Sequence, residues 1–463
     1  MKRVLGVFRG DALRARAMRG SMLTVVSFGG QNALRLGSNL ILTRLLFPEA
    51  FGLMALVQVF MTGLQMFSDL GINASVIRSK RGEDHRFLDT AWTVQILRGV
   101  LLCGVCVLLA GPVAGFYEEP QLQDILPVVG LTAIFAGAAS INAVTVNRQL
   151  LLGRLTALEL GTQALGIIVM IVGALVLESV WALVIGGLAQ SSSKALLSHI
   201  VLPGKRACFL LEWAAFSELF HFGKWIFLST IAGFLLKHGD RAILGKYITL
   251  SELAFYNIAF MLATLPYMLK VALVGRVLYP LYCNKPPAEN PDNRAKILKA
   301  RWMLTGSAFA LSVPLIVFGQ DLVELLYDPR YYTAGSIVTV VGFVWLFRIL
   351  TAGHDPVLLA AGESRAFAGF LVLSAVVRTG LMLIGVIHYG IPGVIGAALL
   401  AEFLVYPVLL ALTRRYRAWD WRHDAAYAII AVAILALALW WEPELWRDLL
   451  ALSGAGAQGD GDV

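Results

Sequence analysis

The stretch that decides the fold, residues 29–76, reads GGQNALRLGSNLILTRLLFPEAFGLMALVQVFMTGLQMFSDLGINASV. It predicts two membrane-length helices that meet at a short turn around Pro48 and Glu49. Each apolar run approaches the ~20 residues that are needed to cross a ~30 Å hydrocarbon core. Similar runs recur to the end of the chain, so this pair of helices sets the pattern for the whole protein.

Each of these two helices carries a stripe of polar residues. In the first helix Asn32, Arg35 and Asn39 share one face, with Gln31 and Ser38 beside it. The stripe of the second helix consists of Gln58, Thr62, Gln65 and Asp69. A charge at bilayer depth costs roughly 2.5–3.5 kcal/mol on insertion scales, so it should face protein or water. The stripes predict a polar internal cavity; the alternative is hydrogen bonding between neighbouring helices.

The composition indicates a polytopic helical membrane protein. Of 463 residues, 58% are hydrophobic and 15% are charged, and the mean hydropathy is +0.74. The net charge of +8 would suggest nucleic acid in a soluble protein. Here the basic residues fall in short loops, which reports topology, and no nucleic-acid partner is expected. The cysteines Cys103 and Cys106 lie in an apolar helix and indicate no redox site.

Thirteen spans are predicted, twelve in a core and one at the end of the chain. They are 22–46, 50–76, 88–116, 122–147, 155–177, 180–200, 216–236, 250–280, 299–319, 333–352, 366–388, 392–412 and 425–441. Every second loop is rich in Lys and Arg, as in Arg78, Lys80, Arg81 and Arg86 after the second span. This alternation predicts a cytoplasmic N-terminus and, after thirteen spans, an outer C-terminus.

The predicted fold class is all-α, with two six-helix lobes and an added thirteenth helix. The expected parts are a basic N-terminus (1–21), an N-lobe (22–206), a C-lobe (207–412), a basic loop with the last helix (413–441) and a flexible Gly-rich tail (442–463). The longest loop, about 281–298, is too short to fold as a domain. A polymerase or ligase usually needs such a domain, so an enzyme is the least favoured class.

A weak internal repeat supports the two lobes. Residues 42–56, LTRLLFPEAFGLMAL, align with 244–259, LGKYITLSELAFYNIA, with one inserted residue. Arg44 then falls on Lys246 and Glu49 on Glu252. Both stretches join the first and second helices of a six-helix half, so the halves have the same orientation. Parallel repeats of this kind occur in transporters, with the substrate site between them.

Charges inside the predicted spans are mostly positive. The cations are Arg35, Arg98, Lys224, Lys270, Arg276, Arg348 and Arg378, and the anions are Asp69, Glu159 and Glu402. Arg276, Arg348 and Glu159 lie near span ends, where side chains also reach the interface. The excess of cations predicts an anionic substrate group such as pyrophosphate, which a planar guanidinium binds through two oxygens.

The predicted substrate-binding residues are Arg35, Arg98, Asn32, Asn39, Gln31, Gln58, Gln65, Asp69, Lys224 and Arg378. Two of the carboxylates have a second interpretation. Glu402 and Asp69 are candidates for proton or sodium coupling, or they pair with arginines: Glu402 with Arg378, and Asp69 with Arg35 or Arg98. No P-loop, GxSxG, HExxH or metal-ligand spacing occurs, so neither ATP use nor a cofactor or metal is expected.

Three segments resemble a known family. SNLILTRLLFPEAFGLMALVQVFMTGLQMFSDLGINASVIR (38–78), DRAILGKYITLSELAFYNIAF (240–260) and YGIPGVIGAALLAE (389–402) are similar to the Wzx-like polysaccharide exporters, flippases of lipid-linked oligosaccharides in the MOP superfamily. The resemblance runs from about residue 20 to 412, and the thirteenth helix departs from the twelve-helix core of the family.

The resemblance implies two six-helix lobes that alternate between inward-open and outward-open states in the bacterial inner membrane. The implied cargo is an undecaprenyl-pyrophosphate-linked glycan for exopolysaccharide, capsule or O-antigen, and a polysaccharide polymerase and export machinery are implied partners besides the lipid bilayer. The positions that match the pyrophosphate-binding arginines of the first lobe are Arg35 and Arg98. The competing hypothesis is a Na⁺- or H⁺-coupled multidrug or metabolite antiporter, in which intramembrane carboxylates would be essential.

Overall fold

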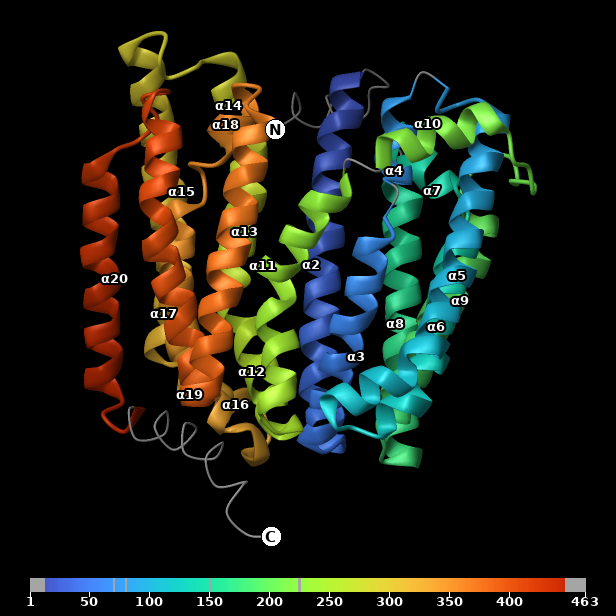
Figure 1. The fold of residues 1–463 in the computed structure, drawn as a ribbon, viewed down its shortest axis with the longest axis horizontal. Coiled ribbons are helices and arrows are strands. Elements are labelled where there is room, and N and C mark those ends of the chain that lie inside the picture. The colour runs from blue at the N-terminus through green and yellow to red at the C-terminus, as the bar shows by residue number, and fades with distance from the viewer. Residues whose placement is uncertain (1–12, 70, 80, 150–151, 224–225, 446–463) are drawn as a thin grey trace, which may run out of the picture. The chain divides into compact units, whose positions relative to one another are not determined.

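The computed structural model describes residues 13–69, 71–79, 81–149, 152–223 and 226–445. Within these ranges every regular element is a helix, as Figure 1 shows. The all-α prediction is therefore confirmed. The chain divides into two compact units, Met1–Thr230 and Ile231–Val463.

The described part of unit 1 contains six long helices, and three of them are followed by a short one. In chain order they are α2 (Leu13–Leu45), α3 (Pro48–Phe67), α4 (Ile72–Arg78), α5 (His85–Tyr117), α6 (Gln121–Ala138), α7 (Asn142–Arg148), α8 (Leu152–Leu177), α9 (Trp181–Val201) and α10 (Trp213–Gly223). Helix α11 (Ile226–Tyr247) begins in unit 1 and continues into unit 2.

Unit 2 continues with α12 (Leu250–Ala263), α13 (Leu265–Leu273), a π-helical turn (Val274–Leu278), α14 (Tyr279–Asn284), α15 (Pro291–Val317), α16 (Gly319–Leu326), a 3₁₀ turn (Pro329–Tyr331), α17 (Thr333–Thr351), α18 (Pro356–Ala360), α19 (Ser364–Arg414) and α20 (Trp421–Trp441). Helix α19 is two helices joined at Gly390, where φ is 55° and ψ is −134°. Its halves correspond to the predicted spans 366–388 and 392–412.

Two predicted spans break earlier than expected. The span 50–76 ends as α3 at Phe67, because the Asp69 carboxylate accepts the Gly71 N–H at 2.9 Å and Gly71 takes a left-handed φ of 62°. The span 122–147 ends as α6 at Ala138, and α7 starts separately at Asn142. Within the described ranges, nine helical segments are long and apolar enough to cross a membrane. The count of thirteen crossings stays a prediction.

The two aligned stretches of the internal repeat form the same local structure. Helix α2 ends with Arg44 in its last turn and α3 begins with Glu49 in its first turn. Helix α11 ends with Lys246 in its last turn, and α12 begins with Glu252 in a capping box with Thr249. A cation at a helix C-terminus and an anion at an N-terminus both complement the helix dipole. The repeat therefore encodes two equivalent helix–turn–helix corners.

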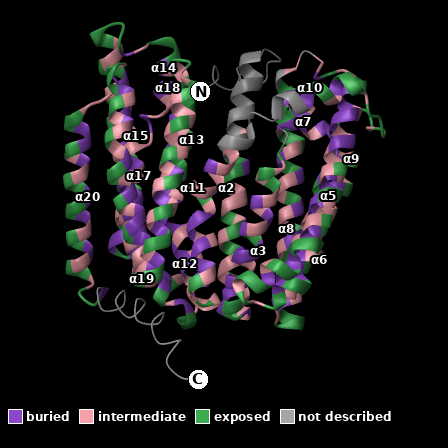
Figure 2. Cartoon of the chain, in the orientation of Figure 1, coloured by how far each residue is buried: buried purple, intermediate pink, exposed green. Residues whose placement is uncertain are grey.

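Small residues let neighbouring helices of unit 1 approach closely. A Cβ added to Gly99 of α5 would lie 2.4 Å from the Ala133 carbonyl of α6, and one on Gly137 would lie 2.6 Å from the Gln95 carbonyl. Glycines at such contacts are typical of membrane helices, where packing replaces the hydrophobic effect. In Figure 2 the buried residues of both units run along helix faces, while many exposed residues on the other faces are large and apolar.

The last helix is a packed part of unit 2. Tyr427, Ala431, Ile434 and Ala438 of α20 are buried in one cluster with residues of α15 and α17, among them Phe309. The Tyr427 hydroxyl donates to the Trp302 carbonyl at 2.8 Å. This packing fixes α20 on the unit rather than leaving it as a separate anchor.

Candidate functional site

The N-terminal half of the α2 stripe bonds to α8. The Gln31 amide donates to the Ser27 hydroxyl at 2.8 Å and to the Glu159 carboxylate at 3.1 Å, and Ser27 donates to the same carboxylate at 3.1 Å. Gln163 of α8 donates to the Gln31 carbonyl at 3.0 Å. These contacts match the alternative that the sequence left open, hydrogen bonding between packed helices.

The rest of the α2 stripe stays nearer its own helix or the surface. The Asn32 amide donates to the Phe28 carbonyl at 2.8 Å, and the Asn39 carbonyl accepts from the Thr43 hydroxyl at 2.8 Å. Asn39 is half-buried, whereas Arg35 is exposed on the helix. Arg35 is therefore accessible in this structure.

The α3 stripe is also accessible. Gln58 and Gln65 are exposed, and the Gln58 amide donates to the Thr62 hydroxyl at 3.1 Å. Asp69 is exposed too, and one of its carboxylate oxygens closes the turn after α3. The predicted Lys224 lies outside the described residues.

Arg98 of α5 is the cation that the structure ties most firmly to this stripe. Its Nε donates to the Ser68 hydroxyl at 2.9 Å, and its Nη2 donates to the Gln65 carbonyl. Both acceptors lie at the C-terminal end of α3, where a cation satisfies free carbonyls and complements the dipole. Among the described residues no carboxylate lies within ion-pair distance of Arg98. The half-buried guanidinium therefore has no ion-pair partner among these residues, and the Asp69 carboxylate attracts it only from a longer distance.

In unit 2 the predicted residues Arg378 and Glu402 line one cavity of about 400 Å³. Arg348 Nη1 lies 2.5 Å from Glu402 Oε1, and Arg378 Nη1 lies 3.8 Å from the same oxygen. Arg348, which the sequence left open as an interfacial residue, is thus the main partner of Glu402. A carboxylate held between two guanidinium groups is a poor ligand for a metal cation, because the positive guanidinium groups repel the metal ion.

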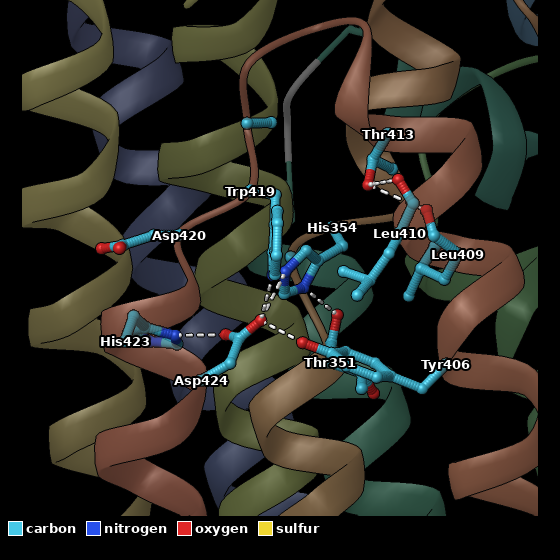
Figure 3. A network of polar contacts seen from close by, with 12 residues as sticks. Thr351, His354, Tyr406, Leu409, Leu410, Thr413, Trp419, Asp420, His423 and Asp424 are labelled. Carbon is cyan, nitrogen blue, oxygen red and sulfur yellow. Dashed lines mark hydrogen bonds and ion pairs between the residues drawn. The ribbon is translucent and has the colours of Figure 1, made fainter.

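A second polar cluster of unit 2 was missed by the sequence analysis (Figure 3). Its centre is the Asp424 carboxylate at the start of α20, whose side chain is 7% exposed. The groups that bond to it are Arg301 (3.4 Å), His423 Nδ1 (2.7 Å), Trp419 Nε1 (3.1 Å) and the Tyr406 hydroxyl, and His354 Nε2 lies 3.4 Å away. Because Tyr406 also lines the cavity, the last helix supports the cavity wall.

The hydrogen bonds of this cluster define its protonation. His354 Nδ1 lies 3.0 Å from the Thr351 carbonyl, which only an N–H can satisfy, so Nε2 is the nitrogen that accepts from Arg301 at 2.8 Å. On the other side, Lys270 Nζ donates to the Thr305 hydroxyl at 2.9 Å, and Thr305 lies 3.0 Å from His423 Nε2. His423 and Asp424 directly precede the predicted span 425–441, and no spacing along the chain shows that groups from so many helices converge there.

Just before the start of α5 in unit 1, Arg81 links two segments. It pairs with Asp84 at 2.8 Å and with Glu212 at 3.0 Å. Hydrogen bonding to Arg81 lowers the pKa of Asp84, and hydrogen bonding to Asp84 and Glu212 raises the pKa of Arg81. The Glu212 segment also follows the α5 surface, where the N–H groups of Cys208, Leu210 and Glu212 donate to Asp89, Thr93 and Thr90.

Solved structures share this architecture. The lipid II flippase MurJ in an inward-closed conformation matches 95% of this chain and 98% of its own, with a TM-score of 0.69 and 13% identity. An inward-facing multidrug resistance MATE family transporter of the MOP superfamily matches 86% and 95%, with a TM-score of 0.64 and 14% identity. The fold is therefore that of a class of multi-pass membrane transporters.

The sequence comparisons narrow this class. The teichuronic acid biosynthesis protein TuaB of Bacillus subtilis is 25% identical over 76% of this chain and 75% of its own. The lipopolysaccharide biosynthesis protein WzxC of Escherichia coli is 21% identical over 88% and 84%, and the succinoglycan biosynthesis transport protein ExoT of Rhizobium meliloti is 21% identical over 79% and 73%. The chain belongs to the polysaccharide biosynthesis protein family, which matches residues 41–334.

Proposed function

We propose that this protein is a flippase that moves an undecaprenyl-pyrophosphate-linked oligosaccharide across the bacterial inner membrane by alternating access. The glycan would serve exopolysaccharide, capsule or O-antigen assembly. Family membership supports transport of a polysaccharide precursor rather than enzymatic catalysis, and the names of TuaB, WzxC and ExoT refer to the biosynthesis or transport of such polymers.

The observation that carries the proposal is the state of Arg98. Its guanidinium lies in a membrane-length helix and is half-buried, and within the described part of the chain it hydrogen-bonds only to a hydroxyl and a carbonyl, with Asp69 attracting it from beyond ion-pair distance. A cation there without a direct ion pair is unfavourable, and a pyrophosphate would supply that pair through charge-assisted hydrogen bonds. The exposed Arg35 on α2 adds a second cation of the same unit.

A multidrug antiporter is the runner-up, since a MATE transporter has the same fold. That function would require an accessible carboxylate in the spans as its cation or proton site. Glu402 is bound by Arg348 and Asp69 closes a backbone turn, so neither is arranged primarily for a cationic substrate. The structure thus favours the anionic cargo.

The test is glycan export in cells that depend on this protein. Replacement of Arg98 by Gln removes the charge, whereas Arg98→Lys keeps it. We expect export to fall at least tenfold with Gln and to recover in part with Lys, because a hydrogen bond to a charged group contributes about 1.5–3 kcal/mol. The matched control is Arg86→Gln, at the exposed start of the same helix.

Export at the wild-type level by the Arg98→Gln protein, at equal abundance in the membrane, would contradict the proposal. Drug resistance on overexpression, with no effect on glycan export, would support the antiporter instead. In this proposal the N-terminus is cytoplasmic and the C-terminus is periplasmic. A polysaccharide polymerase and the export machinery would then receive the glycan.

A further inference from the structure

The cavity of unit 2 contains a cationic group that the protein itself does not satisfy. Arg378 Nη1 is buried and has no hydrogen-bond partner, and the Arg378 side chain is only 8% exposed. The Glu402 carboxylate is 3.8 Å away, too far for a hydrogen bond, because its Oε1 is engaged by Arg348 at 2.5 Å. Buried polar groups are nearly always bonded, so this donor indicates a ligand.

The remaining lining of the cavity is mainly apolar. Its apolar side chains include Leu236, Val271, Leu359, Phe370, Leu371, Val405 and Leu409, and its uncharged polar ones are Tyr267, Tyr279, Thr351, Ser374 and Tyr406. The wall also includes Val274 and Gly275 of the π-helical turn, a wide turn of a kind that often occurs at functional sites. A volume of about 400 Å³ with a few polar groups among apolar side chains is typical of a site for a small organic ligand.

We propose that this cavity is a lipid-phosphate site, which binds a phosphate head group at Arg378 and the first carbons of its apolar chain along the wall. The inference rests on the proposed function only for its choice of a prenyl chain. A sugar carboxylate fits less well, because a sugar needs many hydrogen-bond partners and most of the wall offers none. A lipophilic cation fits less well still. The Glu402 carboxylate is flanked by two guanidinium groups, and the other carboxylate of the wall, Asp355, accepts the Gly353 N–H at 3.4 Å.

The surroundings hold the two arginines in place for this task. Tyr406, which lines the cavity, is fixed through its hydroxyl by Asp424 of α20, and the Thr351 carbonyl beside it is bound by His354. Arg348 lies over the Trp345 ring at 5.8 Å in addition to its pair with Glu402. Arg348 is thus fully engaged, and Arg378 is the guanidinium left to bind an incoming anion.

The experiment measures binding to the purified full-length protein in detergent. Farnesyl phosphate is the probe, farnesol lacks its charge, inorganic phosphate lacks its chain, and glucuronate represents an acidic sugar. Dihexanoyl phosphatidylglycerol separates the two lipid sources. We expect farnesyl phosphate to bind at least tenfold more tightly than farnesol, phosphate or glucuronate. Tighter binding of phosphatidylglycerol than of farnesyl phosphate would assign the same site to a membrane phospholipid.

Three variants locate the site. Arg378→Gln should weaken farnesyl phosphate binding about tenfold, the loss of one charged hydrogen bond. Ser374→Leu, which fills the cavity without a change in charge, should weaken it as well and covers the case of an unfolded Arg378 variant. Arg415→Gln is the matched control, because Arg415 forms an exposed pair with Glu363 elsewhere in unit 2.

Equal affinity for farnesol and farnesyl phosphate, preferred binding of glucuronate, or unchanged binding by folded Arg378→Gln and Ser374→Leu proteins would each overturn the inference. These results are separable from a failure of the proposed function. The export assay depends on Arg98 of unit 1, whereas this assay measures binding at Arg378 without transport.

Discussion

The two units handle charge inside membrane-length helices differently. In unit 1 the polar side chains bond mostly to backbone or to neutral groups, and Arg35, Gln58, Gln65 and Asp69 are exposed. In unit 2 the charges are buried and joined in networks, as in Arg348–Glu402–Arg378 and Arg301–Asp424. The difference teaches that unit 1 presents charge to its surroundings, whereas unit 2 uses charge to hold its own helices together.

The strongest test of this difference between the units is to replace Asp424, where we expect the largest loss of stability. Asp424→Ala would leave Arg301 buried without its carboxylate, and a broken buried ion pair destabilises by about 3–5 kcal/mol. Thermal unfolding in detergent should show the largest loss of any variant discussed here. The control is Asp420→Ala four residues earlier, which removes a helix N-cap worth about 1 kcal/mol and a hydrogen bond from Trp302 Nε1 at 3.3 Å, but no buried ion pair. Equal losses of thermal stability for the two variants would mean that the Asp424 cluster does not stabilise unit 2.

A second large effect is expected at Glu402. Glu402→Gln would leave Arg348 and Arg378 as neighbouring buried cations, at a loss of about 3 kcal/mol. Adding Arg378→Met to that variant should restore part of the stability, because one of the two repelling charges is gone. A double-mutant cycle on thermal stability measures this coupling. Strictly additive losses would show that the three groups do not interact.

These clusters mark the limit of prediction from the sequence. The apolar runs, the charges at the helix ends and the Pro48 turn were enough to predict the all-α fold and the equivalent turns at Glu49 and Glu252. These features are local properties of the chain. The breaks at residues 68–71 and 139–141 were missed, because a single Asx turn or short kink hardly alters hydropathy.

The residue types of the candidate site could be predicted from the sequence, but not which residue pairs with which. The sequence analysis proposed Arg378 as the ion-pair partner of Glu402. Arg348, thirty residues earlier on α17, makes the shorter contact with this carboxylate. The Asp424 cluster draws on α15, α19, α20 and the turn after α17. Contacts between residues more than a hundred positions apart depend on packing, which no periodicity encodes.

A smaller effect sharpens the description of unit 1. Gln31→Ala removes the two hydrogen bonds of the amide to Ser27 and Glu159, and side-chain hydrogen bonds between membrane helices average about 0.6 kcal/mol each. We therefore expect a loss of about 1 kcal/mol in thermal unfolding and normal glycan export. Gln58→Ala, which removes an exposed contact with Thr62, should leave stability nearly unchanged. Loss of export with Gln31→Ala would instead make this stripe part of the substrate path.

The smallest effect concerns the exposed pair of Arg81 and Asp84, the surface counterpart of the buried networks. Because Arg81 lowers the pKa of Asp84, the pair stabilises the fold fully above the ordinary Asp pKa of about 3.9, and this contribution is lost as the pH falls through the lowered value. Asp84→Asn should remove that part of the pH dependence and leave stability at pH 7 only slightly reduced, since exposed pairs contribute little. Unfolding followed from pH 6 to pH 3 at low salt measures it, and 1 M salt should narrow the gap between the two proteins. A gap that persists in high salt would mean that Asp84 does not act mainly through its charge, because Asn keeps the N-cap bond to the Arg86 N–H.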